Sequence, residues 1–327
     1  MKNSPIAGLL RVVLILGAAF LFLSRPAASS AEPLSSYVIF SQTKVMIGPN
    51  SVITGLVGAN FKTDNDSELN TEVNLNGNAM VVGNVQSGDD VRIGSGGAIT
   101  GTITLPQSPA GLNPLNPSGS GTLTVAPTAT HGAVINAMPA LPSLPAATVF
   151  SSGGTSYNLG NNAVLTLGPG SYGSVVLGGS ATLNLSSGTY SFDSLKSANS
   201  LNWNIDLTGG PIHIFVTDYA QFGSVDMSLT GGTAADVTIE THHTGLNAFQ
   251  AGGSSHVFGD VFTPNGTIHI GSGSSQNASF TGHLWGYDVD IEHGVGGMVP
   301  EPSTISLIAL GGLAFAFRLR KTLRRRS

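Results

Sequence analysis

A five-residue pattern recurs along this chain: an apolar residue, any residue, glycine, any residue, and a second apolar residue. It occurs at residues 53–57, 81–85, 99–103, 257–261 and 280–284. Glycine adopts backbone conformations that other residues avoid, so a short apolar segment around a glycine is typical of a brief β-strand next to a tight bend. The pattern therefore predicts an all-β chain built from many short strands.

The spacing of these segments suggests how the strands are arranged. Gly83 and Gly101 are 18 residues apart, and the same interval separates Gly170 from Gly188. Further pairs at this interval are Tyr172 with Tyr190 and Leu177 with Leu195. A 23-residue interval aligns Gly259 with Gly282, Val261 with Leu284, Phe262 with Trp285, Ile268 with Ile291, and Gly271 with Gly294. Repeats of about this length predict a β-solenoid with Gly-rich turns, one coil per repeat. The alternative is a β-sandwich, whose strands recur every 8–12 residues or so.

The C-terminal segment combines three features in a fixed order. Pro300, Glu301 and Pro302 precede an apolar run at residues 305–317. A basic stretch follows, formed by Arg318, Arg320, Lys321, Arg324, Arg325 and Arg326. The apolar run predicts a transmembrane helix of marginal length, about 20 Å against a bilayer core of about 30 Å. The basic residues act as a membrane stop and predict a cytoplasmic C-terminus.

This order of motif, apolar helix and basic tail resembles the PEP-CTERM sorting signal. The resemblance implies that an exosortase-type sorting enzyme of a Gram-negative bacterium processes the chain, and it places Pro300, Glu301 and Pro302 as the sorting motif. It also implies exopolysaccharide or biofilm surroundings. The alternative is an ordinary C-terminal membrane anchor.

The N-terminus predicts export as well. Lys2 and Arg11 come before an apolar run at residues 12–23, and small residues lead to Ala31. This is the pattern of a secretory signal peptide, which signal peptidase would remove near Ala31. The alternative is a second membrane helix, for which the apolar run is short. We therefore expect an inner-membrane-anchored precursor and a mature form on the cell surface or outside the cell.

Between these two segments the chain is acidic. Residues 32–299 contain four Lys and Arg against 17 Asp and Glu, a formal charge of −13, although the whole chain carries −5. Nucleic-acid recognition needs a Lys/Arg patch, so nucleic acid is not an expected partner. There is no cysteine, so the exported protein is stable without disulfides.

The sequence divides into five segments. These are a signal peptide at 1–31, a first solenoid region at 32–104, a Pro-rich linker or excursion at 105–148, a second solenoid region at 149–299, and the sorting signal at 300–327. The linker carries eight prolines, a density that central strands do not tolerate. It either separates the two regions or packs as a long loop against the side of the solenoid, and residues 121–125 are a candidate strand within it.

The first solenoid region resembles the bactofilins and related polymer-forming β-solenoids. The resemblance rests on IGPNSVITGLVG at 47–58, NGNAMVVGNV at 76–85 and IGSGGAITGTI at 93–103. It implies short stacked coils. Bactofilins are cytoplasmic or membrane-associated, whereas this chain has export signals, so only the coil architecture is taken over.

Two groups of residues are candidate metal ligands. Asp64, Asp66, Glu68 and Glu72 offer closely spaced oxygen atoms that suit Ca²⁺, although the EF-hand pattern is absent. Seven of the eight histidines lie between His213 and His293, among several carboxylates, but follow no metal-binding spacing. The 23-residue alignment places His269 beside Glu292, which predicts a cross-strand pair. The alternative for each group is a set of solvated polar side chains.

No nucleophile elbow, zinc-protease motif or phosphate loop occurs, so we expect no catalytic residues. The predicted function is that of a non-enzymatic structural protein of the cell surface or extracellular matrix, with exopolysaccharide or a second copy as partner. The alternative is a carbohydrate-active enzyme, either a polysaccharide lyase or a glycosidase, on a β-helix. The aromatic residues that would line a sugar-binding groove are Trp203, Tyr219, Trp285 and Tyr287.

Overall fold

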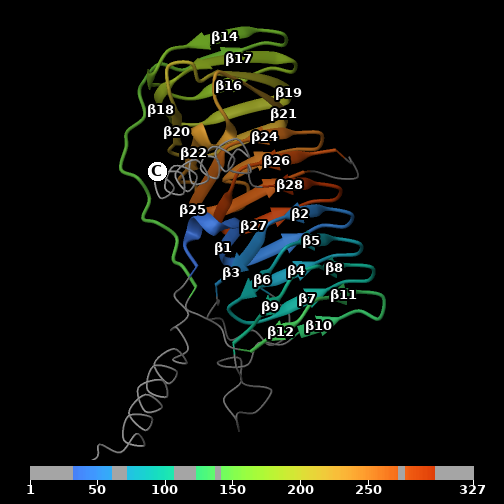
Figure 1. Cartoon of the computed structure of the whole chain (residues 1–327). Coiled ribbons are helices and arrows are strands. Elements are labelled where there is room, and N and C mark those ends of the chain that lie inside the picture. The colour runs from blue at the N-terminus through green and yellow to red at the C-terminus, as the bar shows by residue number, and fades with distance from the viewer. Residues whose placement is uncertain (1–31, 61–71, 107–122, 137–140, 272–276, 299–327) are drawn as a thin grey trace, which may run out of the picture.

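The fold follows from short β-branched segments that alternate buried and exposed side chains. A computed structural model describes residues 32–60, 72–106, 123–136, 141–271 and 277–298. Within these ranges 28 strands join into one sheet that winds around a central axis (Figure 1). The strand pairings are parallel, as between β4 and β7 and between β14 and β17. This is the predicted β-solenoid, in place of two sheets packed face to face.

The strands of the N-terminal part are β1 (Tyr37–Ile47), β2 (Val52–Thr54), β3 (Leu56–Ala59), β4 (Val73–Leu75), β5 (Met80–Val82), β6 (Val85–Ser87), β7 (Val91–Ile93), β8 (Ala98–Ile99), β9 (Ile103–Thr104), β10 (Leu123–Val125), β11 (Thr130–His131) and β12 (Val134–Ile135). Those of the C-terminal part are β13 (Tyr157–Leu159), β14 (Val164–Leu167), β15 (Gly170–Ser171), β16 (Val175–Leu177), β17 (Ala181–Ser186), β18 (Gly188–Phe192), β19 (Leu195–Asp206), β20 (Ile212–Val216), β21 (Ala220–Thr230), β22 (Val237–Thr241), β23 (Phe249–Ala251), β24 (His256–Phe258), β25 (Asp260–Ile270), β26 (Ser279–Thr281), β27 (Leu284–Ile291) and β28 (Gly296–Met298). Two 3₁₀ turns, η1 (Leu34–Ser36) and η2 (Ala234–Asp236), complete the described elements.

Each full coil contributes to three faces. Face 1 contains β3, β6, β18, β20 and β22, and face 3 contains β2, β5, β14, β17 and β28. Face 2 contains β4, β7, β16 and β23. The long strands β1, β25 and β27 bend from face 1 into face 2, and their pairing register shifts where they bend. Face 2 carries the candidate site described below.

The corner between faces 2 and 3 shows why the sequence places Asn and Gly there. Asn50 and Asn78 adopt φ values of 57°, and Gly96 adopts 72°. These three residues occupy the same corner of successive coils, because β1 pairs with β4 and β4 with β7. Asn and Gly tolerate this left-handed conformation better than other residues do. The same corner therefore recurs from coil to coil without strain.

The coils do not stack in the order of the sequence. The last coil pairs with the first: β27 lies parallel to β1, with Val289 beside Val45, and β28 lies parallel to β2. We call this junction the seam. From the seam, β1 to β12 run toward one end of the rod, while β13 begins at the other end and the coils return to the seam (Figure 1). Parallel pairing between segments so distant in sequence leaves no local sequence signal.

A segment without regular secondary structure connects the two ends along the outside of the rod. We call residues 141–156 the strap. It lies on face 1, where Thr148 donates from its backbone N and its Oγ1 to the two carboxylate oxygens of Glu240, at 2.6 and 2.7 Å. Phe150 packs against Phe215 and His242 with ring centroids 5.1 and 4.7 Å apart. This carboxylate is buried beneath the strap.

The segment predicted as a linker contains regular structure. β10, β11 and β12 lie between residues 123 and 135 and extend the sheet beyond β7, β8 and β9. β10 falls within the candidate strand at residues 121–125, whereas β11 and β12 were not predicted. More residues separate β10 from β7 than separate β7 from β4. The repeat interval is therefore lost at this point in the sequence. Residues 107–122 and 137–140 lie outside the described part of the chain.

The interior widens where the coils lengthen. The N-terminal part has short coils, in which Val73 pairs with Val91, and its core consists of aliphatic side chains such as Ile103. Within the C-terminal part the coils become longer, as where Leu201 pairs with Val225. A longer coil encloses a larger cross-section, which aromatic side chains such as Trp203 fill. Burial of this apolar interior is the main stabilising contribution to the fold.

Two of the aligned repeats are out of register by two residues. Val261 faces Leu284 as the 23-residue interval predicts, but Ile268 faces Val289 and not Ile291. A register shift between Thr263 and Thr267 accounts for the difference. The alignment of Leu177 with Leu195 fails in the same way, since Leu177 pairs with Ser197. Extra residues at the coil corners change the interval within a single coil.

Candidate metal centre

Of the four residues predicted to bind Ca²⁺, only Glu72 lies in the described part of the chain. Asp64, Asp66 and Glu68 lie outside it, so the Ca²⁺ site stays a prediction. The Glu72 side chain is buried, and its Oε2 accepts a hydrogen bond of 2.9 Å from the backbone N–H of Asp90. The carboxylate thus ties two successive coils together.

Burial raises the pKa of Glu72 and of the neighbouring Asp89. Desolvation raises the pKa of Glu72 to about 7, and the charge of Asp89 adds to the rise while the Asp90 N–H opposes it. Desolvation, followed by repulsion from Asp90, raises the pKa of Asp89 to about 7. Both groups therefore titrate near neutral pH.

These raised pKa values predict a stability that falls as the pH rises. Between the ordinary carboxylate range and about pH 7, the folded protein binds more protons than the unfolded chain, so protonation favours folding. For Glu72, which is 3% exposed, the difference corresponds to as much as about 3 kcal/mol. We expect a higher Tm near about pH 5 than near about pH 8, and Glu72→Gln should reduce that difference.

The control for this experiment is Asp226→Asn, which removes an exposed carboxylate of face 3. It should leave the pH dependence of Tm nearly unchanged. A Glu72→Gln variant with the full pH dependence of the parent would contradict the assignment.

Three of the described histidines hydrogen-bond directly to a carboxylate. His242 Nε2 lies 2.7 Å from Glu240 Oε1, and His283 Nδ1 lies 2.7 Å from Asp260 Oδ1. The third, His243 Nδ1, lies 2.5 Å from Asp218 Oδ1. The pairs His243–Asp218 and His283–Asp260 join neighbouring coils. Each of these three histidines therefore has a carboxylate partner at hydrogen-bond distance.

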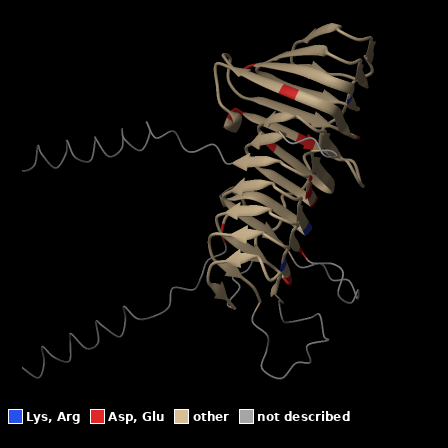
Figure 2. Ribbon diagram, turned by 90° about the vertical axis from the view of Figure 1, so that its right-hand side faces the viewer, with Lys and Arg blue, Asp and Glu red and all other residues tan. Residues whose placement is uncertain are grey.

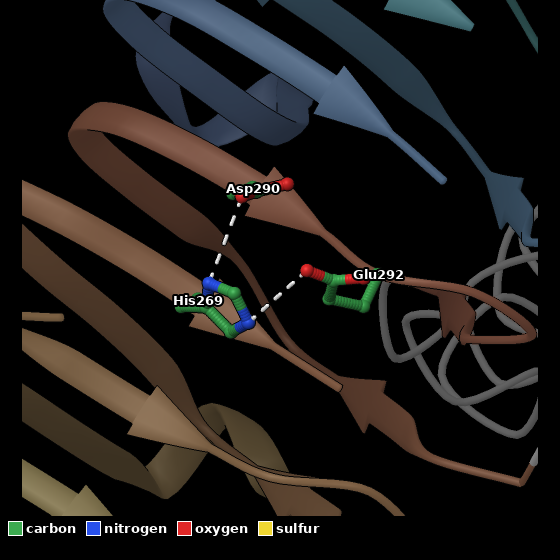
Figure 3. A group of neighbouring side chains, drawn as sticks. All are labelled: His269, Asp290 and Glu292. Atoms are coloured by element: carbon green, nitrogen blue, oxygen red, sulfur yellow. Dashed lines mark ion pairs between the residues drawn. The ribbon is translucent and has the colours of Figure 1, made fainter. Parts of the chain in front are cut away.

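His269 is arranged differently, between two carboxylates at a greater distance. Its Nδ1 lies 3.6 Å from Asp290 Oδ2, and its Nε2 lies 3.6 Å from Glu292 Oε1 (Figure 3). One ligand atom from each of the three side chains can be chosen so that all lie within 4.8 Å of one another. The His269 side chain is 18% exposed, Asp290 31% and Glu292 38%. This group, the His269 cluster, is half-buried on face 2.

Strand register places the three side chains together. His269 on β25 pairs with Asp290 on β27, and both point outward because Ile268, Ile270, Val289 and Ile291 are buried. Glu292 follows β27 directly, and its backbone N–H donates to Ile270 O at 2.8 Å. The sequence correctly predicts His269 and Glu292 as neighbours, but misses Asp290 as the direct register partner. Residues 264–266, Pro-Asn-Gly, are a turn signature that could have revealed the two extra residues.

Glycines on both adjacent coils make room for Glu292. A Cβ atom at Gly271 would lie 2.7 Å from Glu292 Cβ, and one at Gly48 would lie 2.5 Å from the Glu292 carbonyl carbon. Real Cβ atoms do not approach this closely. The Ser51 hydroxyl also holds the Glu292 backbone by donating to its carbonyl oxygen at 2.7 Å. The backbone beneath this carboxylate is therefore fixed from two sides.

The electrostatics of the cluster reflect its partial burial. Desolvation raises the pKa of Asp290, and Glu292 and Asp288 add to the rise, while His269 and Lys44 oppose it. Charged side chains are sparse over the rest of the rod (Figure 2). The cluster is a local concentration of negative charge with one imidazole, a donor set that suits a divalent cation.

The aromatic residues named as candidates for sugar binding do not form one surface. Trp203 is fully buried in the core. Trp285 donates from its indole N–H to Tyr37 O at 3.0 Å and packs against His283. Tyr219 lies against His243, and Tyr287 is 40% exposed.

Comparison with known proteins identifies the C-terminal segment. A family model described as the PEP-CTERM protein-sorting motif matches residues 299–321. The match includes Pro300, Glu301 and Pro302, as well as Arg318, Arg320 and Lys321 of the basic stretch. It supports an exosortase substrate, made as a secreted and membrane-anchored precursor. No curated protein matches the chain.

The membrane and export segments belong to the part of the chain that the structure leaves undescribed. The predicted signal peptide at 1–31 and the predicted transmembrane helix within 300–327 both lie there. Among the described residues, no helix has the length and apolar character needed to cross a membrane.

Proposed function

We propose that this chain is a non-enzymatic structural protein of the cell surface or extracellular matrix of a Gram-negative bacterium. In this proposal an exosortase-type enzyme delivers it, and it associates there with exopolysaccharide in a biofilm. The observation that carries the proposal is the sorting motif at 299–321, attached directly to a continuous parallel β-rod.

The outer surface of the rod supports a role in contact with glycans. On face 3, Asn184 Nδ2 donates to Thr166 Oγ1 at 3.0 Å, and Asn204 Nδ2 donates to Asn184 Oδ1 at 2.9 Å. Ser228 Oγ then donates to Asn204 Oδ1 at 2.8 Å. These four residues form a polar ladder across four coils, with a spacing of about 4.8 Å between strands. A regular row of amides and hydroxyls fits the hydroxyl groups of an extended polysaccharide.

The charge of the protein fits the same role. With a formal charge of −13 over residues 32–299, the rod repels polyanions except where a cation intervenes. It therefore favours neutral glycans, or acidic glycans bridged by divalent ions. The rod also stays soluble at high local concentration because like charges separate the copies.

A carbohydrate-active enzyme is the second candidate, and one observation favours it. Asp290 and Glu292 are adjacent carboxylates, and burial raises the pKa of Asp290. Retaining glycosidases use a carboxyl pair about 5 Å apart, one with a raised pKa. The two candidates differ in what happens to the polysaccharide, so one experiment can separate them.

The test combines the purified protein with exopolysaccharide from its host. We expect the protein to sediment with the polysaccharide, while the number of reducing ends stays constant over time. Replacing Asn184 and Asn204 with alanine should weaken the binding by about tenfold, as expected for a few lost hydrogen bonds. Asn158→Ala, an exposed asparagine of face 2 outside the ladder, is the control.

Release of oligosaccharides would contradict the structural proposal. If that release also disappeared in Asp290→Asn or Glu292→Gln, the enzyme would be the better assignment. If the Asn184/Asn204 double variant and Asn158→Ala bound the polysaccharide equally, the polar ladder would not be the binding surface.

A further inference from the structure

The His269 cluster has the spacing of metal ligands and not of hydrogen-bond partners. The other histidine–carboxylate pairs described above approach to between 2.5 and 2.7 Å, whereas His269 stays 3.6 Å from each carboxylate. A nitrogen–oxygen hydrogen bond spans about 2.7–3.2 Å. His269 is therefore held near two carboxylates without bonding directly to either.

A cation shared between His269 and a carboxylate accounts for a separation of this size. Zn²⁺ binds imidazole nitrogen and carboxylate oxygen at about 2.0–2.2 Å, which places two tetrahedral ligands about 3.3–3.6 Å apart. Each 3.6 Å separation matches the upper end of that range, and the ion would account for the one that involves the ring nitrogen it binds. One ring nitrogen would bind the ion, and the third ligand atom lies within 4.8 Å of the other two. Small rotations of the two half-buried carboxylates on a fixed backbone complete the site.

We propose that His269, Asp290 and Glu292 bind one divalent cation of the Zn²⁺ class. The mixed nitrogen and oxygen ligands favour such an ion over Ca²⁺, which prefers oxygen ligands alone. Three protein ligands leave at least one position for water, because the cluster faces solvent on face 2. Gln250 and Met46 occupy the register positions on either side and bring no further charge.

The bound ion would cross-link two coils next to the seam. His269 belongs to β25, and the two carboxylates belong to the coil of β27, which pairs with β1 on its other side. An ion that binds only the folded arrangement stabilises it by mass action. This inference goes beyond the proposed function and stands whether or not the protein binds a polysaccharide.

The experiment is a calorimetric titration of the full-length protein in detergent with ZnCl₂, using an affinity tag that contains no histidine. We expect one saturable binding event per chain and a Tm that rises with the Zn²⁺ concentration. His269→Asn and Glu292→Gln should each weaken the Zn²⁺ affinity by at least about 10–100-fold. Losses of this size occur even when only a residue that hydrogen-bonds to a metal ligand is removed. CaCl₂ should produce a much weaker event.

The controls separate ion binding from general damage. His213→Asn removes another strand histidine, and Asp226→Asn removes an exposed carboxylate; both lie away from the cluster. Each should bind Zn²⁺ like the parent, and all four variants should keep the parent's Tm without metal within a few degrees. The proposal is overturned if the parent shows no saturable event, or if His269→Asn and His213→Asn bind Zn²⁺ equally.

Discussion

Replacing Pro300, Glu301 and Pro302 with alanine is expected to leave the full-length protein in the membrane fraction, with its C-terminal tail intact. The two prolines fix the backbone on either side of the carboxylate, and alanine loses both that geometry and the charge. The sorting enzyme then lacks the features that distinguish this tail from an ordinary membrane anchor. Since residues 299–321 match the sorting motif, we expect processing to fall below detection and not merely to slow.

Intact mass spectrometry of the protein from cell fractions measures this outcome. The parent should yield a mature form that lacks the tail, and the mass also reports removal of the predicted signal peptide. Replacing Ser303 and Thr304 with alanine is the matched control, since these polar residues directly follow Pro302 and precede the apolar run. A triple variant with the mass and location of the parent would refute the role of the motif, and the tail would then be a plain anchor.

Replacing Gly282 with alanine is expected to destabilise the rod by about 3–5 kcal/mol. Gly282 has a φ of +139°, a conformation that residues with a side chain rarely adopt. An added Cβ would also collide with the backbone of Gly259 on the adjacent coil. The coils cannot move apart to relieve this collision without breaking the hydrogen bonds of β25 with β27.

Thermal or denaturant unfolding measures this effect against a matched glycine. Gly296 lies in the neighbouring strand β28, and nothing lies within 4 Å of the position where its Cβ would be. Gly296→Ala should change the free energy of unfolding by no more than about 0.5 kcal/mol. Equal losses in both variants would show that the close approach of Gly282 and Gly259 has no special energetic role.

The solenoid could be predicted because its repeats place glycine where the backbones of adjacent coils approach closely. Gly101 lies one coil beyond Gly83, and its N–H donates to the Gly83 carbonyl at 2.9 Å. Backbones can approach so closely only where no side chain intervenes. The same requirement aligned Gly259 with Gly282. Close approaches between glycines are therefore visible in the sequence, but equal spacing alone is not enough, since Gly170 pairs with Tyr190 and not with Gly188.

The order of the coils could not be predicted in this way. Any coil of alternating apolar residues can stack on any other. The sequence around Val45 therefore does not indicate that Val289 lies beside it. The position of the strap could not be predicted either. Its attachment depends on one buried carboxylate, that of Glu240, whose partner Thr148 is 92 residues away in the sequence. Pairing between such distant segments depends on the whole fold and not on any local pattern.

The candidate metal centre was partly visible in the sequence. Alternation identified His269 and Glu292 as outward-facing neighbours, which the structure confirms. Asp290 was missed because the 23-residue alignment assumed a constant interval, whereas the register shifts between Thr263 and Thr267. A period of two identifies the face of a strand, but a single inserted pair of residues changes which neighbours meet.

The seam determines where mechanical load enters the molecule. The chain enters the sheet at Tyr37 and leaves it at Met298, on coils that pair with each other in the middle of the rod. The sorting segment begins at the next residue, so a tethered precursor is held at its midpoint and both tips project freely to either side. Any pull on the tether acts first on the ladders that join β28 to β2 and to β26. Those hydrogen bonds, and not the covalent continuity of successive coils, set the tension that the attached protein withstands.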